Sequence, residues 1–309
     1  MLAAFGQVTQ NLVEPFGGLD FRFAAVALAF QAANLVLRSF AWRNVLAAAF
    51  PSRHVPVVGV GAAYAAGVAL NAFLPARGGE AAKVGLVRLQ LPGASVVTIA
   101  ASGSVILVLD ALLGGALLIG AWALGVLPAV PRPPHAVTAL GEKPLFLVAA
   151  AALFALGAWF AVRKVNRFAR RTWEDVLQGG AVLRSPRRYV QSVVSLQLGA
   201  WACRIGFVLA LLAAFGLPAS LPLATVVVVL GGLSTVVPAA PGGAGAQQLL
   251  VVYGLHGAVS ASAALSFSVL LQVAVTAMNT TIGIAAAMLV LRTLHPLVAV
   301  RSGLTARSG

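Results

Sequence analysis

The sequence predicts an all-α protein: a polytopic transmembrane helical bundle that forms a single transmembrane domain over residues 1–309. Of the 309 residues, 60% are hydrophobic and only 9% are charged, whereas roughly a quarter are charged in a soluble domain. Apolar runs of about 20 residues, the length that crosses a bilayer, recur along the chain. Two of them are interrupted by proline and a Gly-Gly pair, which predicts two re-entrant broken helices in an inverted repeat.

The N-terminal segment and the first span differ clearly in polarity. Residues 1–20 are too short and too polar to cross, so we expect them to lie on the membrane surface. The first span is expected at 21–37, where Arg38 ends the apolar run. Trp42, next to Arg43, is typical of an interfacial anchor on the cytoplasmic side.

The next stretch carries the first break. Residues 57–91 are expected to form a re-entrant hairpin, because the part that follows the break is too short to cross the bilayer. Residues 94–127 predict a second span, which contains a single acidic residue, Asp110. These elements together make repeat 1, about 21–127.

A linking region, 128–189, separates the two repeats. It contains one further span at 145–162, followed by a strongly basic loop, 163–188. Apolar and aromatic residues lie between the arginines of this loop at roughly helical spacing, which is typical of an amphipathic helix on the cytoplasmic leaflet. A solvated basic loop fits the same pattern equally well.

Repeat 2, about 190–292, has the same order as repeat 1. A span at 190–215 precedes a broken segment, 221–255, and a last span follows at 258–291. Because one crossing separates the repeats, the second is expected to be inverted, with its broken hairpin entering from the opposite side.

The cations support this topology. With the spans placed as above, nearly all of them fall on one side, which the positive-inside rule identifies as cytoplasmic in an inner-membrane protein. That side would carry Arg38, Arg43, Arg53, Arg88, the cations of loop 163–189, Arg292, Arg301 and Arg307 at the C-terminus. This distribution accounts for the net charge of +14 without a nucleic-acid partner.

The first break, PARGGEAAK, predicts a binding site for an anion. A helix that restarts at Gly78 and Gly79 has unpaired backbone N–H groups in its first turn, and such groups bind phosphate readily. Arg77 offers a fork of donors, and Lys83 adds a second cation. Glu80 is expected to fix one of these two cations. The alternative is a self-contained ion pair that only pins the broken helix.

The second break, PAAPGGAG, adds a further helix N-terminus at Gly242 and Gly243. Asn71 and Gln248 supply neutral donors near the two breaks, with interhelical packing as their alternative role. Arg204 lies near the middle of its span, where a cation is costly. It either joins the site or pairs with Asp110.

Catalytic motifs are missing from the sequence. It has no HExxH and no GxSxG, and the PGGAG stretch lacks the Lys-Ser/Thr pair that completes a nucleotide-binding loop. We therefore expect neither an enzyme activity nor a cofactor or metal site.

Both breaks and their surroundings resemble the lysylphosphatidylglycerol synthase transmembrane region, a family of flippase-like integral membrane proteins. The resemblance covers about residues 22–292. The matching positions are Asn71, Pro75, Arg77, Gly79 and Glu80 in the first motif, then Arg88 and Asp110, and Pro238 with Pro241 to Gly245 in the second motif. The two motifs together are fairly specific.

The resemblance implies a helical membrane module that handles lipid. In larger members of the family, this module moves aminoacylated phospholipid between leaflets beside a soluble synthase domain, which these residues do not contain. Gln248 stands where the family usually has Glu, and residues 1–20 do not supply the extra N-terminal span of many members.

We therefore expect an inner-membrane lipid flippase or transporter rather than a lipid synthase. Its ligand would be an anionic phospholipid or a polyprenyl-phosphate-type lipid, whose headgroup binds between the two broken helices. Its other partners would be the membrane itself and either a membrane protein or a second copy of the chain. The alternative is a non-transporting partner or lipid-binding scaffold for a lipid or cell-envelope glycan synthase.

Overall fold

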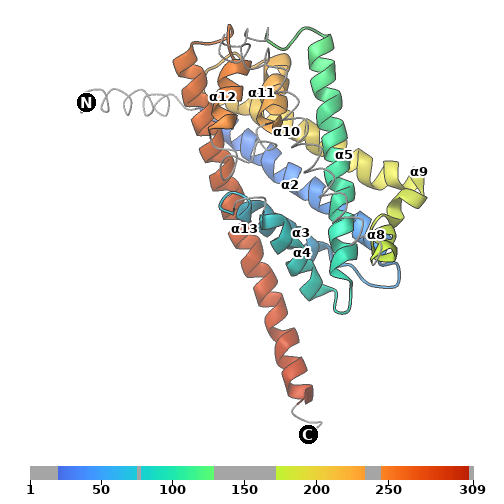
Figure 1. Cartoon of the computed structure of the whole chain (residues 1–309). Helices are drawn as coiled ribbons and strands as arrows, with labels where there is room; N and C mark the ends of the chain where they lie inside the picture. Colours follow the sequence, from blue (N-terminus) through green and yellow to red (C-terminus); the bar gives the residue numbers. More distant parts are fainter. Residues whose placement is uncertain (1–19, 75–77, 129–171, 234–244, 306–309) are drawn as a thin grey trace, which may run out of the picture.

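The computed structural model describes residues 20–74, 78–128, 172–233 and 245–305, with side chains up to residue 288. The regular elements in these ranges are all helical, which confirms the predicted all-α class. The first group contains a long helix, two short helices and another long helix (Figure 1). They are α2 (Phe21–Ala49), α3 (Val57–Leu70), α4 (Gly78–Gln90) and α5 (Val96–Ala123).

The second group has the same order, preceded by three short elements. These are α8 (Trp173–Gly179), the 3₁₀ turn η2 (Ala181–Arg184) and α9 (Pro186–Tyr189). A π-helical turn, η3 (Val190–Val194), continues α9 into α10 (Ser195–Ala214). The group ends with α11 (Leu221–Leu233), α12 (Ala246–Gly254) and α13 (Ala261–Thr305).

Four helical stretches are long and apolar enough to cross a membrane: Phe21–Ala49, Val96–Ala123, Pro186–Ala214 and Ala261–Met288. At 1.5 Å per residue, a helix of this length extends about 42 Å, which exceeds the hydrocarbon thickness of about 30 Å. The α3, α4, α11 and α12 helices have at most 14 residues and are too short to cross. A polytopic helical membrane protein is therefore confirmed, and the expected span at 145–162 lies outside the described residues.

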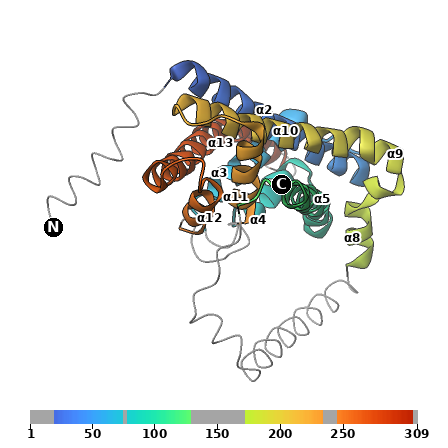
Figure 2. The ribbon, with the colours of Figure 1, turned by 90° about the horizontal axis from the view of Figure 1, so that it is seen from above.

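The two groups pack against each other through two pairs of helices. The α2 helix runs along α10, and α13 runs along α3. Figure 2 shows α2 and α10 along one side of the bundle, with the four short helices between α13 and α5. Asn34 fixes the register of α2 by donating to the Ala200 carbonyl of α10 at 2.6 Å, and Asn44 donates to the Ser192 carbonyl at 2.9 Å.

Loop contacts define the two ends of the bundle. At one end, Arg53 donates to the Pro92 carbonyl at 2.6 Å, so the loops after α2 and α4 meet there. At the other end, the Tyr253 hydroxyl of α12 donates to the Pro128 carbonyl after α5 at 2.8 Å. The first end carries Arg53 and also Arg88, which donates to the Leu91 carbonyl at 3.4 Å. Arg184 of η2 lies near it, because α8 bonds to Ala49 at the end of α2, and Arg187 and Arg188 follow on α9.

The end of the first span differs from the sequence prediction. The first span does not end at residue 37, because α2 continues as one helix to Ala49. Arg38 stays inside it because this cation has a carboxylate partner on α5, described below. In the basic loop, the described part forms α8 and η2, with Trp173 and Leu177 exposed, while residues 163–171 lie outside the described ranges.

Candidate functional site

The first break is closed by a single asparagine. Asn71 follows the end of α3, and its Oδ1 accepts a hydrogen bond from the backbone N–H of Gly79 at 2.9 Å. Its Nδ2 donates to Glu80 Oε1 at 3.4 Å. Asn71 therefore takes the role of an N-cap for α4, although it lies eight residues before Gly79.

Glycine is required at the start of α4 because the backbones are almost in contact. A Cβ atom built on Gly79 would lie 2.0 Å from the Gly67 carbonyl oxygen of α3. Only a residue without a side chain lets two helices approach this closely. Gly78 opens α4 and is half-buried, whereas Arg77, Gly242 and Gly243 lie outside the described residues.

Lys83 is enclosed by an acid and two aromatic rings. Its Nζ lies 2.5 Å from Glu80 Oε2, which confirms that Glu80 fixes one of the two candidate cations. The same atom lies 5.0 Å from the ring centre of Trp42 and 4.9 Å from that of Tyr64. Lys83 is 8% exposed, and its charge is balanced by Glu80 and the two rings. This environment fits the alternative in which the Glu80–Lys83 pair only pins the broken helix.

Trp42 is not the interfacial anchor that the sequence suggested. Its side chain is 1% exposed, and Nε1 donates to the Ser102 hydroxyl of α5 at 3.0 Å. The prediction was wrong because α2 continues through the arginines, so Trp42 faces the core and not the membrane surface. Its ring thereby becomes one wall of the Lys83 environment.

Asp110 pairs with Arg38 and not with Arg204. The Arg38 guanidinium of α2 lies 2.5 Å from Asp110 Oδ2, and Trp201 Nε1 of α10 donates to Asp110 Oδ1 at 2.8 Å. Both charged side chains are about four-fifths buried, with exposures of 18% and 20%. Asp110 is thus the partner of a cation, as expected, and it links three helices.

Arg204 has a different environment from the two paired cations. Its guanidinium lies 5.1 Å from the ring centre of Trp201, one turn earlier on α10. A Cβ built on Gly232 would lie 3.8 Å from its Nη2, so the cation faces the last turn of α11, where the second break begins. Within the described parts of the chain, Arg204 makes neither an ion pair nor a hydrogen bond to an acceptor.

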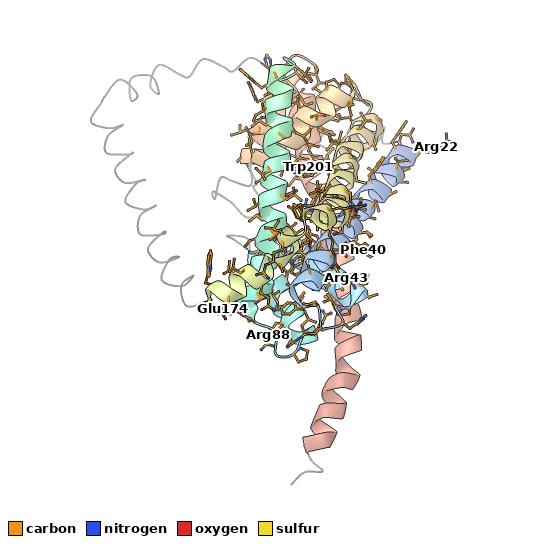
Figure 3. All side chains as sticks on the ribbon, turned by 90° about the vertical axis from the view of Figure 1, so that its right-hand side faces the viewer. Arg22, Phe40, Arg43, Arg88, Glu174 and Trp201 are labelled. Carbon is orange, nitrogen blue, oxygen red and sulfur yellow. The ribbon has the colours of Figure 1, made fainter. Side chains whose placement is uncertain are left out.

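These side chains form one cluster, named here the buried charged cluster because all its members except the exposed Glu80 are buried or half-buried. It reaches from the first break to the second. Its members in spatial order are Asn71, Glu80, Lys83, Tyr64, Arg38, Asp110, Trp201 and Arg204. Tyr64 connects the two halves, because its ring centre lies 4.9 Å from Lys83 Nζ and its side chain lies close to Arg38. Three cations and two carboxylates leave this cluster with one excess positive charge. Figure 3 labels Trp201 of this cluster, in the interior of the bundle and away from Arg88 and Glu174.

Two polar side chains, one in the cluster and one beside it, have buried atoms without partners among the described residues. Gln197, one turn before Trp201 on α10, is fully buried, and neither its Nε2 nor its Oε1 has a hydrogen-bond partner in the described structure. The Nε of Arg38 is in the same situation. Nearly all buried polar groups in proteins are paired, so these atoms are places where a water or a ligand oxygen is needed.

Beyond the second break, Gln248 has a local role. Its Oε1 accepts from the backbone N–H of Gly245 at 2.6 Å and caps the first turn of α12. Gly245 has φ of 85°, a left-handed conformation that favours glycine. Among the described residues, Gln248 therefore acts on its own helix, in parallel with Asn71 at the first break.

Sequence reasoning missed four members of the site region: Arg38, Tyr64, Trp201 and Gln197. The sequence does contain a signal for Gln197 and Trp201. Together with Arg204 they are spaced at helical intervals, so these three hydrogen-bonding side chains share one face of α10. The sequence places Arg38 at the membrane surface, because no residue near it in the chain is a counter-ion. Its partner, Asp110, is 72 residues away. Only the packing of α2 against α5 brings the two together.

Comparison with known families gives one match. The model of the Lysylphosphatidylglycerol synthase TM region matches residues 8–283. This range includes both breaks and every residue of the buried charged cluster. Comparison with curated proteins gives no match.

Proposed function

Because the chain belongs to the lysylphosphatidylglycerol synthase transmembrane family, we propose that it is a flippase-like lipid transporter of the inner membrane. Its substrate would be an anionic lipid whose phosphate-bearing headgroup enters between the two broken helices. A phospholipid and a polyprenyl phosphate share this chemistry. The family implies a membrane role related to lipids. The proposal adds an anionic lipid as the ligand and transport as the activity.

The observation that carries the proposal is the environment of Arg204. A charged group inside a spanning helix is costly, and it is normally paired. Lys83 and Arg38 have carboxylate partners, whereas Arg204 has an aromatic ring and the end of α11. A phosphate oxygen would supply the missing acceptor and would neutralise the excess charge of the cluster.

The sequence-predicted residues have distinct roles in this proposal. Arg77 and Arg204 would contact the headgroup directly, together with the N–H groups that follow Gly78, Gly242 and Gly243. The remaining candidates, Asn71, Gly79, Glu80, Lys83 and Gln248, would shape the two breaks through the contacts described above. The Nε–H of Arg38 would donate to an oxygen of the headgroup or of water as the headgroup moves, and Gln197 would donate through Nε2 and accept through Oε1.

Alternating access would come from one repeat rocking against the other. In the proposed arrangement, α3–α4 and α11–α12 are re-entrant hairpins of an inverted repeat. The pairs α2–α10 and α3–α13 form most of the contact between the repeats. The chain of contacts from Asn71 to Arg204 gives both hairpins a shared set of charges. A movement of either hairpin would therefore change the surroundings of the same headgroup.

A second candidate function is a non-transporting lipid-binding scaffold for a lipid or cell-envelope glycan synthase. The two closed ion pairs, Glu80–Lys83 and Arg38–Asp110, favour it, because such pairs stabilise one packed state. A scaffold would hold the same headgroup without moving it. Binding and transport must therefore be measured separately.

The transport test uses the purified chain in phosphatidylcholine vesicles with a trace of fluorescent phosphatidylglycerol. Dithionite, which quenches only the outer leaflet, reports how quickly inner-leaflet lipid becomes accessible. We expect the parent chain to accelerate this movement, and Arg204→Gln to slow it about ten-fold, since a lost charged hydrogen bond costs about 1.5–3 kcal/mol. Arg77→Ala should slow it as well.

Arg187→Gln is the matched control, because Arg187 is an exposed cation on the short helix α9 and should leave transport unchanged. Equal transport by Arg204→Gln and the parent would remove the basis of the proposal. If the parent retains phosphatidylglycerol in native mass spectrometry, loses it on Arg204→Gln and moves no lipid, the scaffold function is correct.

A further inference from the structure

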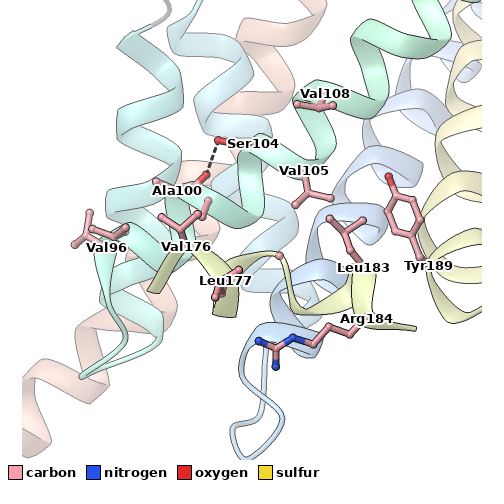
Figure 4. Close-up of a pocket in the computed structure, with 13 residues that line it drawn as sticks. Val96, Ala100, Ser104, Val105, Val108, Val176, Leu177, Leu183, Arg184 and Tyr189 are labelled. Atoms are coloured by element: carbon pink, nitrogen blue, oxygen red, sulfur yellow. Dashed lines mark hydrogen bonds between the residues drawn. The ribbon is translucent and has the colours of Figure 1, made fainter. Parts of the chain in front are cut away.

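An apolar groove lies outside the buried charged cluster, between α5 and the α8–η2 segment. It has a volume of about 830 Å³ and is lined mainly by valine, alanine and leucine side chains (Figure 4). Val96, Val105 and Val108 of α5 form one wall, and Leu177 with Leu183 forms the other. Ser104 adds no free polar group, because its hydroxyl donates to the Ala100 carbonyl of its own helix at 3.2 Å.

The second wall of the groove is held firmly by the bundle. Gly179 presses against α5, since a Cβ at this position would lie 2.5 Å from the Ala101 Cβ and 2.7 Å from the Thr98 carbonyl oxygen. Thr98 donates to Asp175 at 3.3 Å. Gln178 donates to the Ala49 carbonyl of α2 at 2.9 Å. The groove is therefore part of the folded structure and not a gap beside a loose loop.

The position and charge of the groove indicate its occupant. Its first wall belongs to a membrane-spanning helix, so a molecule that fills it comes from the bilayer. Arg184 lines the end of the groove, Tyr189 lines it as well, and Arg187 and Arg188 follow exposed on α9. Of the two acids on α8, Asp175 is bonded to Thr98, and Glu174 is exposed to solvent. An apolar slot that ends in cations matches the chemistry of an anionic lipid.

We propose that this groove binds a hydrocarbon chain of an anionic phospholipid whose phosphate lies against Arg184. The site is separate from the buried charged cluster, and the proposal stands whether or not the chain transports lipid. It would fix a lipid in the leaflet next to the basic end of the bundle. Attraction to one arginine near an anionic headgroup region predicts an enrichment of about five-fold over a neutral lipid.

The test uses site-specific photocrosslinking to lipid in vesicles of phosphatidylcholine and phosphatidylglycerol. The photoreactive residue p-benzoylphenylalanine replaces Ser104, which lines the groove. In a control chain it replaces Leu112, which is 65% exposed on the same helix and does not line the groove. Mass spectrometry of the crosslinked protein then identifies each adduct. At position 104, the ratio of phosphatidylglycerol to phosphatidylcholine adducts should be about five times the ratio of these lipids in the bilayer, and at position 112 it should equal the bilayer ratio.

A second pair of variants tests the cation. Arg184→Gln should abolish the enrichment at position 104, whereas Arg187→Gln, an exposed arginine that does not line the groove, should preserve most of it. Adducts at position 104 that follow the bulk lipid composition would overturn the proposal. So would a crosslink from position 104 to residues 145–162, because the chain itself would then cover the groove.

Discussion

Asp110 is the residue on which the packing of three helices depends. It accepts from Arg38 of α2 and from Trp201 of α10 while it belongs to α5. Asp110→Asn would leave Arg38 without its counter-ion in the bundle, and breaking a buried pair costs about 3–5 kcal/mol. We expect a clearly lower Tm in detergent, measured by intrinsic fluorescence.

Two variants control this measurement. Glu174→Gln removes an exposed carboxylate of α8 and should leave the Tm unchanged. The double variant Arg38→Met, Asp110→Leu removes both charges and should recover most of the lost stability, because an apolar pair can replace a buried ion pair. A double variant as unstable as Asp110→Asn would contradict an ion-pair origin of the effect.

Trp201 contributes a hydrogen bond and a ring, and the two can be separated. Trp201→Phe retains an aromatic ring near Arg204 and removes the N–H that bonds to Asp110. Loss of a hydrogen bond to a charged group predicts a destabilisation of about 1.5–3 kcal/mol, smaller than that of Asp110→Asn. Thermal unfolding of the two variants side by side tests this order, and the reverse order would contradict it.

At the scale of elements, the short helices depend on close backbone contact. Gly79→Ala would place a Cβ 2.0 Å from the Gly67 carbonyl, so α4 would have to move away from α3. Gly85→Ala on the same helix meets no atom within 4 Å and should be neutral or raise stability by up to about 1 kcal/mol through helix propensity. We expect only Gly79→Ala to lower the Tm and the rate of lipid movement. Similar effects of both substitutions would refute the close-contact explanation.

At the scale of the whole molecule, the structure divides the loops between two ends. Ser52 follows α2 and Ser95 precedes α5, in the loops that meet at the end with the exposed arginines. Ser220 follows α10, whose end bonds to Asp20 at the start of α2, and Ser260 follows α12, whose end bonds to Pro128 after α5, so both lie at the opposite end. The positive-inside rule predicts that the first end faces the cytoplasm. In a Cys203→Ser background, single cysteines at these four positions report this orientation.

An impermeant maleimide gives the readout in vesicles of known orientation. Ser52→Cys and Ser95→Cys should be labelled only in inside-out vesicles, and Ser220→Cys and Ser260→Cys only in right-side-out ones. Labelling of Ser52→Cys and Ser220→Cys from the same side would contradict the two-ended arrangement. If each of the four cysteines is labelled only in the opposite type of vesicle, the two-ended arrangement is correct but the basic end faces outward.

The helical membrane fold and the broken stretches around Gly79 and Gly245 could be predicted from the sequence. Hydropathy and the Pro-Gly interruptions act locally, and a helix needs no distant partner for its backbone hydrogen bonds. The Glu80–Lys83 pair was predictable for the same reason, because residues three apart share a helix face. The end of the first span was not, since hydropathy treats Arg38 as an isolated charge.

Sequence alone therefore determined the class of the protein, its breaks and its family, because all three are written in local composition and spacing. The tertiary structure decided how the charges are divided: Asp110 pairs with Arg38, Trp42 and Tyr64 enclose Lys83, and Arg204 faces the end of α11. The physical reason is the low dielectric of the membrane interior, where the energy of a charge depends on which partner the packing of distant helices brings to it.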